Sequence, residues 1–209
     1  GDLSINFGGS LELENCTLMM FSHLTKSVRV ASGELRLNGT AFMSVGTPGR
    51  LTPSVAGISV DAASSVRVHN SSFRWLSEFA VSTDYATFMN VSVRYASSAG
   101  MKFESCSPSV DGLSIEWAPI GLQLSNSNGI VSNLSVSRSR EYAVYCSQSG
   151  TELESVRLNN SSRGLYSYWG SMSLNGFSTA GCEYGVLSSY TALRISGSTF
   201  AGCAGAGLY

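Results

Sequence analysis

Apolar and polar residues alternate with a period of two along much of the chain, and this alternation breaks once within a recurring hexamer. Residues 131–136 read Val-Ser-Asn-Leu-Ser-Val, with the break at Asn133. A period of two predicts strands, and Asn, Gly or Ser tolerates the unusual backbone angles of a bend. The hexamer therefore predicts two short strands that meet at a bend.

This hexamer recurs at a nearly constant interval. The residues at its break are Asn15, Gly39, Asn70, Asn90, Gly112, Asn133, Ser155, Gly176 and Gly197. Their successive spacings are 24, 31, 20, 22, 21, 22, 21 and 21 residues. A second pattern keeps the same interval, namely a small residue followed by an apolar one, as in Gly121-Leu122 and Gly164-Leu165. Two patterns that share a period of about 21 residues indicate a repeat architecture.

The one long spacing predicts an insertion. Between Gly39 and Asn70, residues 45–54 carry two of the four prolines of the chain and predict an inserted surface loop. Residues 1–209 are otherwise expected to form one domain. The chain stops at Tyr209, inside an expected strand, so we expect a fragment of a longer protein.

The period and the residue types select one class of repeat. A leucine-rich repeat needs a helical return segment, whereas the return here is rich in Ser, Gly and β-branched residues, and a hexapeptide repeat would show a period of six. The remaining architecture has three short parallel strands in each turn. Crossovers between parallel strands are almost always right-handed, which sets the hand of the helix. We therefore predict an all-β chain that forms a right-handed, single-stranded parallel β-helix of about 21 residues per coil and roughly nine coils.

The chain resembles the pectin-lyase-like family of right-handed β-helices. The resemblance is carried by the bends at Asn15, Asn70, Asn90 and Asn133, which are expected to stack as an asparagine ladder. The resemblance covers nearly the whole chain, and what it implies is the β-helix architecture. Enzymes of that family use carboxylate clusters with a basic residue or calcium, and no such motif can be carried over to this sequence.

Reading equivalent positions down successive coils gives columns. Two apolar columns flank the bends and predict the core. The column before the bend is Leu13, Leu37, Val68, Phe88, Val110, Val131, Leu153, Leu174 and Ile195; the column after it is Leu18, Phe42, Phe73, Val93, Ile115, Val136, Leu158 and Phe200. An outward strip of small hydroxyls consists of Thr17, Ser72, Ser92, Ser114, Ser135, Ser178 and Thr199, interrupted by Arg157.

Composition narrows the function classes. Charged residues make up only 13% of the chain and the net charge is -1, without the basic stripe that nucleic-acid binding needs. The apolar runs are too short for a membrane span, which needs roughly 20 residues. Few charges with many Ser, Gly and Asn favour an extracellular or cell-surface location.

Three outward columns carry candidate chemistry. Asp61, Asp84 and Glu104 are expected at one place in consecutive coils, where stacked carboxylates could hold Ca²⁺ or form a solvated acidic edge. Calcium is the only cofactor that the sequence suggests.

The second column is aromatic. It consists of Trp75, Tyr95 and Trp117, which directly follow Arg74, Arg94 and Glu116. Rings beside guanidinium groups could bind sugar rings or simply stabilise a corner.

The third column changes from polar to apolar halfway along the chain. It is expected to run Ser59, Ser82, Lys102, Gln123, Tyr145, Tyr166, Leu187 and Tyr209. Its apolar half predicts an interface for a protein or glycan partner, or for another segment of the same protein.

Cysteines and glycosylation motifs add weaker candidates. Cys182 and Cys203 are 21 residues apart, which places them in adjacent coils within reach of a disulfide. Several Asn-X-Ser/Thr motifs arise from the bend column itself. Asn38, Asn159 and Asn160 are expected to lie outside that column and are the predicted glycosylation sites.

Three hypotheses for function follow. The leading one is a non-enzymatic secreted or cell-surface β-helix that is structural or adhesive and presents side faces to a protein or glycan. The second is a polysaccharide lyase or glycoside hydrolase near the acidic column. The third is a self-assembling envelope or fibre module, because unpaired strands at the ends of a solenoid can dock end to end or laterally on another copy.

Overall fold

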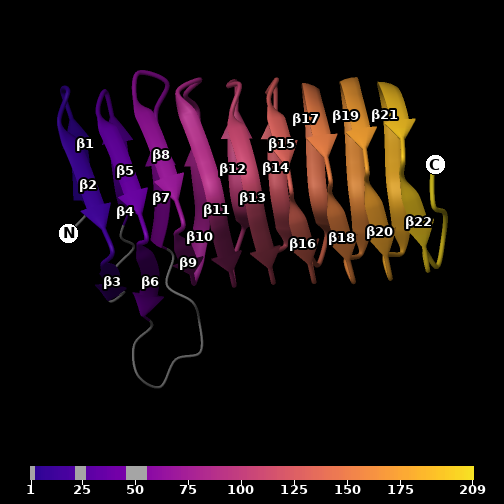
Figure 1. Cartoon of the computed structure of the whole chain (residues 1–209), viewed down its shortest axis with the longest axis horizontal. Coiled ribbons are helices and arrows are strands. Elements are labelled where there is room, and N and C mark those ends of the chain that lie inside the picture. The colour runs from indigo at the N-terminus through magenta and orange to yellow at the C-terminus, as the bar shows by residue number, and fades with distance from the viewer. Residues whose placement is uncertain (1–2, 22–26, 46–55) are drawn as a thin grey trace.

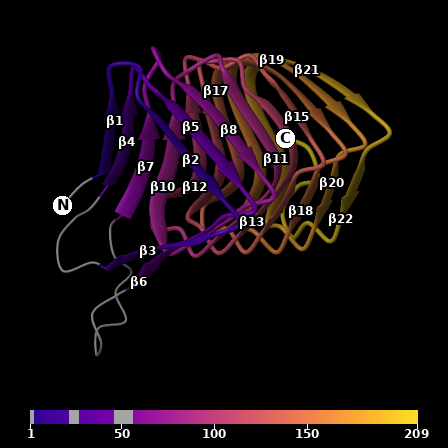
Figure 2. The same ribbon diagram turned by 60° about the vertical axis from the view of Figure 1, so that its left-hand side comes forward.

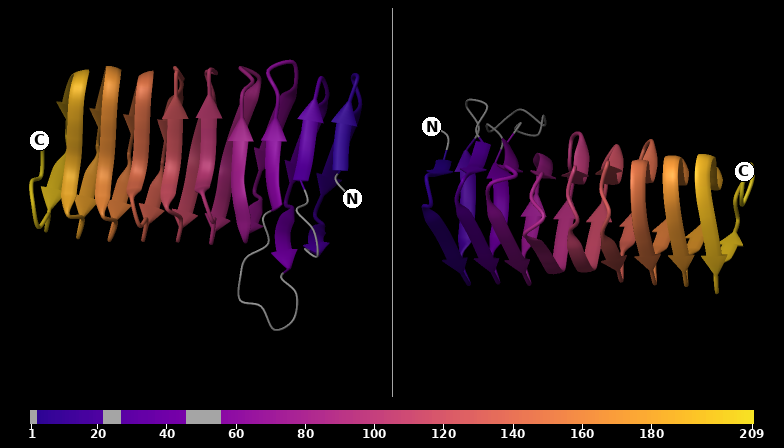
Figure 3. Two further views of the ribbon diagram at one scale, coloured as in Figure 1. Left: turned by 180° about the vertical axis from the view of Figure 1, so that it is seen from behind. Right: turned by 90° about the horizontal axis from the view of Figure 1, so that it is seen from above.

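The computed structural model describes residues 3–21, 27–45 and 56–209, and these form a parallel β-helix. The strands lie side by side in coils stacked along one axis (Figure 1). Each strand pairs in parallel with the equivalent strands of the neighbouring coils. The two further views in Figure 3 show that this stacking continues along the whole length.

Each coil has three faces, which Figure 2 shows from the N-terminal side. Face 1 contains β1 (Leu3–Asn6), β4 (Ser27–Ala31), β7 (Ala56–Val60), β10 (Leu76–Val81), β12 (Ala99–Glu104) and β14 (Ile120–Ser125). Face 2 contains β2 (Ser10–Glu14), β5 (Glu34–Asn38), β8 (Ser65–His69) and β15 (Ile130–Ser132). Face 3 contains β3 (Thr17–Phe21), β6 (Ala41–Val45), β9 (Ser72–Arg74), β16 (Ser135–Ser137), β18 (Arg157–Asn159), β20 (Ser178–Ala180) and β22 (Thr199–Ala201).

Some strands continue around a corner. Those that run from face 2 to face 3 are β11 (Ala86–Arg94) and β13 (Ser109–Glu116). Those that run from face 1 to face 2 are β17 (Tyr142–Glu154), β19 (Arg163–Asn175) and β21 (Tyr184–Ser196).

The strand register confirms the predicted period. Val131 pairs with Val110 of the coil before and with Leu153 of the coil after, at separations of 21 and 22 residues. The described residues make about nine coils of about 21 residues, as predicted. The predicted inserted loop at residues 45–54 lies outside the described residues, apart from Val45 at the end of β6.

The two predicted apolar columns form the core. From Leu37 to Leu174 the column before the bend is at most 5% exposed. The column after the bend is equally buried from Phe42 to Leu158, whereas Leu13 and Phe200 near the ends are only partly buried. Burying each large apolar side chain contributes about 1.5–3 kcal/mol, so these columns dominate the stability of the coils.

Phenylalanines cross the core between faces. Phe79 lies edge-on to Phe73 at 5.2 Å between ring centroids and edge-on to Phe88 at 5.4 Å. Phe88 in turn lies edge-on to Phe103 at 5.5 Å. This edge-to-face geometry is favourable beyond the burial of apolar area, and it ties together strands from all three faces.

The corner between faces 2 and 3 is the bend of the hexamer. All nine predicted bend residues have positive φ, between 47° and 72°. The expected asparagine ladder is shorter than predicted, because Gly39 and Gly112 interrupt it. Only Asn70 and Asn90 are neighbours, with Asn90 Nδ2 donating to Asn70 Oδ1 at 3.2 Å.

The small residue of the second pattern lies on face 1, where coils approach closely. A Cβ added to Gly121 would lie 2.4 Å from the carbonyl oxygen of Ala143, and one added to Gly164 would lie 2.2 Å from that of Gly185. These glycines therefore allow the backbones of adjacent coils to pack together. None of the described residues belongs to a helix long and apolar enough to cross a membrane.

Candidate functional site

The corner between faces 3 and 1 is a second left-handed bend, here called the Trp75 corner. Its residues, aligned by the register of the preceding strands, are Trp75, Tyr95, Trp117, Arg138, Asn160, Gly181 and Gly202. All seven have positive φ, between 49° and 64°. Asn and Gly adopt this region readily, whereas an aromatic residue there costs about 1–3 kcal/mol. The first three coils of this corner thus carry rings where the backbone favours other residues.

Contacts hold these rings in a row along the corner. The rings of Trp75 and Tyr95 stack with their centroids 4.3 Å apart at 11°. Arg138 covers the next ring, because its Cζ lies 5.1 Å from the centroid of Trp117. All three rings remain between 37% and 47% exposed. The predicted aromatic column is therefore a surface feature, although part of each ring packs within the row.

Ion pairs fix the arginines that flank the rings. Arg94 Nε lies 3.4 Å from Glu116 Oε2, and Arg138 Nη1 donates to Glu116 Oε1. Arg74 forms no ion pair with any described residue. Glu116 therefore positions two guanidinium groups of different coils beside the rings. The period alone did not predict the contact of Arg138 with Trp117, because it places residues in columns without orienting their side chains.

Face 3 adjoins this corner and carries mainly small hydroxyls and arginines. The register confirms the predicted hydroxyl strip, with Ala41 as an additional member. Among the outward residues described on face 3 and the Trp75 corner, the charged ones are Arg74, Arg94, Arg138, Arg157 and Glu116. This surface is therefore basic, although the chain as a whole has a net charge of -1.

The predicted tyrosine column lies on face 1, with one correction. Tyr145 pairs with Gln123 and Tyr166, and Tyr166 pairs with Leu187, as predicted. Tyr209 follows Leu208, which bridges to Val186, so it extends this column at the C-terminal end. The register, however, places Ala80 next to Ser59 and Lys102. Ser82 is therefore not a member of the column.

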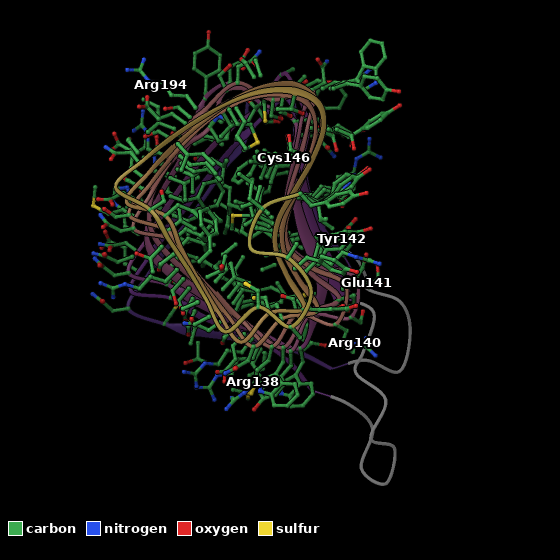
Figure 4. The ribbon with its side chains drawn as sticks, turned by 90° about the vertical axis from the view of Figure 1, so that its right-hand side faces the viewer. Arg138, Arg140, Glu141, Tyr142, Cys146 and Arg194 are labelled. Atoms are coloured by element: carbon green, nitrogen blue, oxygen red, sulfur yellow. The ribbon has the colours of Figure 1, made fainter. Side chains whose placement is uncertain are left out.

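The tyrosines of face 1 are packed against one another. The rings of Tyr145 and Tyr166 stack at 5.6 Å and 20°, and Tyr142 contacts both at 5.4 Å. Arg163 lies over the Tyr142 ring at 5.1 Å. In Figure 4 the Tyr142 side chain projects outward from the wall, whereas Cys146 points into the core. Both predicted tyrosines are half-buried, so they offer less free ring surface than the Trp75 corner does.

The acidic column is wrong in register. Asp61 and Glu104 align with Ser82, because Val60 pairs with Val81 and Val81 with Phe103. Asp84 lies two residues further along. Phe79 and Met101 are paired core residues of adjacent coils, yet Phe79 comes four residues after Trp75, whereas Met101 comes six residues after Tyr95.

The three carboxylates have separate partners. Asp61 pairs with Arg29 at 3.2 Å, Glu104 pairs with Lys102 at 2.9 Å, and Asp84 accepts a hydrogen bond from the Ser107 backbone at 2.7 Å. Within the described ranges, no three His, Cys, Asp or Glu side chains are grouped so that they could hold a metal ion. The structure thus does not assemble the predicted calcium site.

The remaining predicted sites are placed as follows. Cys182 and Cys203 lie in adjacent coils, but both are free thiols, and burial raises the pKa of the Cys182 thiol. Asn38 is exposed at the end of β5, and Asn159 is half-buried in β18. Asn160 lies outside the bend column between faces 2 and 3, as expected, and occupies the Trp75 corner with φ 49°.

Sequence reasoning missed a third left-handed corner, between faces 1 and 2. In its last five coils the bend residues are Ser105, Asn126, Gln148, Trp169 and Tyr190. It has no hexamer signature because the strands β17, β19 and β21 continue through it. The recurrence of Gln148, Trp169 and Tyr190 at intervals of 21 residues is the sequence pattern that could have indicated this corner.

Comparison with known proteins agrees with this architecture. Residues 56–209 match the family described as right-handed beta helix region. The chain belongs to the right-handed β-helix family. No curated protein and no solved structure gave a significant match. Membership of the β-helix family explains the coils and their right-handed course, whereas the chemistry of the site depends on the corners of this particular chain.

Proposed function

We propose that this β-helix is a non-enzymatic binding protein of the cell surface or extracellular space, and that face 3 with the Trp75 corner binds an anionic glycan. The observation that carries the proposal is the placement of Trp75, Tyr95 and Trp117 at left-handed bends. Later coils turn the same corner with Asn160 and glycines, so folding does not require rings there. Strain of this kind is commonly retained where it serves a functional site.

The surroundings of the rings support a sugar ligand. Exposed rings provide apolar surface for the faces of sugar rings, and the hydroxyls of Ser92 and Ser114 lie on the adjoining strands. A row of rings and hydroxyls that repeats once per coil suits an extended chain lying along the helix axis.

The charge of the surface supports an anionic sugar. Four arginines and a single glutamate occupy the described outward positions. A guanidinium group binds a carboxylate or sulfate through two parallel hydrogen bonds. Arg74 is available for this role, because no described acidic residue pairs with it. Glycans that carry uronate or sulfate groups therefore fit this face better than neutral ones.

Isothermal titration calorimetry of the variant Trp75→Asn/Tyr95→Asn/Trp117→Asn tests the proposal. Because Asn tolerates the left-handed region, the variant should melt at or above the temperature of the unmodified chain. Binding of oligogalacturonates or sulfated oligosaccharides should weaken at least about tenfold, a loss of about 1.4 kcal/mol. Arg74→Ala should weaken binding by a smaller factor.

Tyr85→Asn is the matched control. Tyr85 is a 75% exposed aromatic residue outside both the Trp75 corner and face 3, so its replacement should leave binding unchanged. The proposal fails if the unmodified chain binds no anionic glycan, or if the triple variant binds as tightly as the unmodified chain.

A further inference from the structure

A shallow depression of about 450 Å³ lies on face 2, across the last coils. The outward residues that line it are Gly150, Glu152, Ser171, Ser173, Ala192 and Arg194. Gly150 pairs with Ser171, and Ser171 with Ala192, so small residues form a continuous floor across three coils. Arg194 projects outward from this face in Figure 4. The depression is separate from face 3 and from the Trp75 corner.

Exposed rings stand at the corner beside this depression. Trp169 and Tyr190 lie two residues before Ser171 and Ala192, and both have positive φ, 54° and 53°. They are 53% and 78% exposed. As at the Trp75 corner, rings here occupy bend positions that residues such as Asn126 suit better.

The rings here are arranged differently from those of the Trp75 corner. Trp169 and Tyr190 have centroids 5.6 Å apart at 43°, and Tyr168 meets Tyr190 edge-on at 6.0 Å. Because the rings are tilted or perpendicular, their faces are not covered by parallel stacking. These open faces are the surfaces on which a sugar ring stacks.

The charges beside the floor are balanced. Glu152 and Arg194 both align with Ser173, one coil to either side, and both are exposed. Neither forms an ion pair with a described residue. A carboxylate that accepts and a guanidinium that donates hydrogen bonds suit vicinal hydroxyl groups, and their opposite charges give no preference for a charged ligand.

We propose that this depression is a second glycan site, which binds a neutral hexose unit. The sugar ring stacks on the rings of Trp169 and Tyr190, and its hydroxyls bond with Glu152 and Arg194. This inference is independent of face 3, since it uses other residues and a ligand of other charge.

The three tryptophans of the chain permit a test specific to this site. In the variant Trp75→Asn/Trp117→Asn, Trp169 is the single tryptophan, and the proposed anionic site is disabled. Titration with neutral oligomers of glucose, galactose and mannose should change its fluorescence in a saturable way. Adding Tyr190→Asn or Arg194→Ala should weaken that binding about five- to tenfold, whereas adding Tyr85→Asn should leave it unchanged.

Several outcomes would overturn the inference. These are no saturable response to any neutral oligomer, saturation by oligogalacturonates alone, or an unchanged affinity after Tyr190→Asn. The circular dichroism of the double variant shows whether it folds like the unmodified chain. If it does not, calorimetry with the same neutral oligomers is done on the unmodified chain and on the single variant Tyr190→Asn. Absent binding, or equal affinity of the two proteins, would then overturn the inference. Failure of binding at face 3 would leave these outcomes unaffected.

Discussion

Single residues at the corners show two kinds of left-handed bend. Asn133 suits its bend, and its side chain Nδ2 donates to Asp111 Oδ1 of the coil before at 2.7 Å. Trp117 occupies the same backbone region without suiting it, and its ring is exposed. The first kind is explained by folding, because the side chain closes a hydrogen bond between coils. The second kind is the basis of both proposed sites.

The bond to Asp111 predicts a pH dependence of stability. Asn133 and Ser132 donate to its carboxylate, which holds the pKa of Asp111 below its ordinary range. A lowered folded-state pKa stabilises the fold above the ordinary pKa of about 4, and this contribution is lost as the pH falls through the folded-state value. Urea unfolding of Asp111→Asn should therefore differ most from the unmodified chain near neutral pH, and the gap should shrink below about pH 4.

Glu141→Gln is the control for this measurement. Glu141 is exposed, and its carboxylate makes no hydrogen bond or ion pair with the described residues, so its replacement should leave the pH dependence of unfolding unchanged. A gap between Asp111→Asn and the unmodified chain that stays constant from neutral pH to about pH 3 would contradict the prediction.

At the scale of strands and turns, glycines of face 1 lie in close contact with the backbone of the next coil. Gly164 in β19 lies against the carbonyl oxygen of Gly185, and a Cβ there would come within 2.2 Å of that atom. Gly164→Ala should therefore lower the free energy of unfolding by about 1–3 kcal/mol, because the backbone of one coil must move. Chemical unfolding followed by circular dichroism measures this change.

Gly176→Asn provides the comparison. Gly176 has φ 64°, a region that Asn tolerates, and the nearest atoms to an added Cβ are 3.7 Å away. This substitution should change the free energy of unfolding by less than about 1 kcal/mol. Equal effects of the two substitutions would show that the contact between coils on face 1 is not what requires glycine at position 164.

The sequence predicted strands and period because both follow from spacing. Asn, Gly and Ser indicated the bend between faces 2 and 3, because the bend residue has positive φ and these residue types tolerate it. The turns after the Trp75 corner vary between four and six residues, and hydrophobic spacing did not resolve this variation. The positions of Asp84 and Ser82 were wrong for that reason. The residue type at Trp75 and Trp169 does not indicate a left-handed bend, because aromatic residues rarely adopt one.

At the scale of the whole molecule, the near-neutral net charge conceals faces of opposite sign. Face 3 with the Trp75 corner is basic. On face 2 the outward charged residues described are Glu12, Glu14, Glu34, Arg36, Arg67, Asp111, Glu152, Glu154 and Arg194. This face is therefore acidic overall. An anionic chain should be attracted to one side of the solenoid and repelled from another, which orients it before contact.

This asymmetry predicts that the two proposed sites respond differently to salt. The arginines of face 3 are exposed, with Arg94 and Arg138 side chains 50% and 49% accessible, so dissolved ions screen their attraction for an anionic glycan. Raising NaCl from about 50 mM to about 500 mM should weaken oligogalacturonate binding at least about fivefold. Binding of a neutral oligomer beside Trp169 should change less than about twofold, because stacking and hydrogen bonds to uncharged hydroxyls are little screened. Calorimetry across this salt range measures both, and salt-independent binding of the anionic ligand would contradict the role of the basic face.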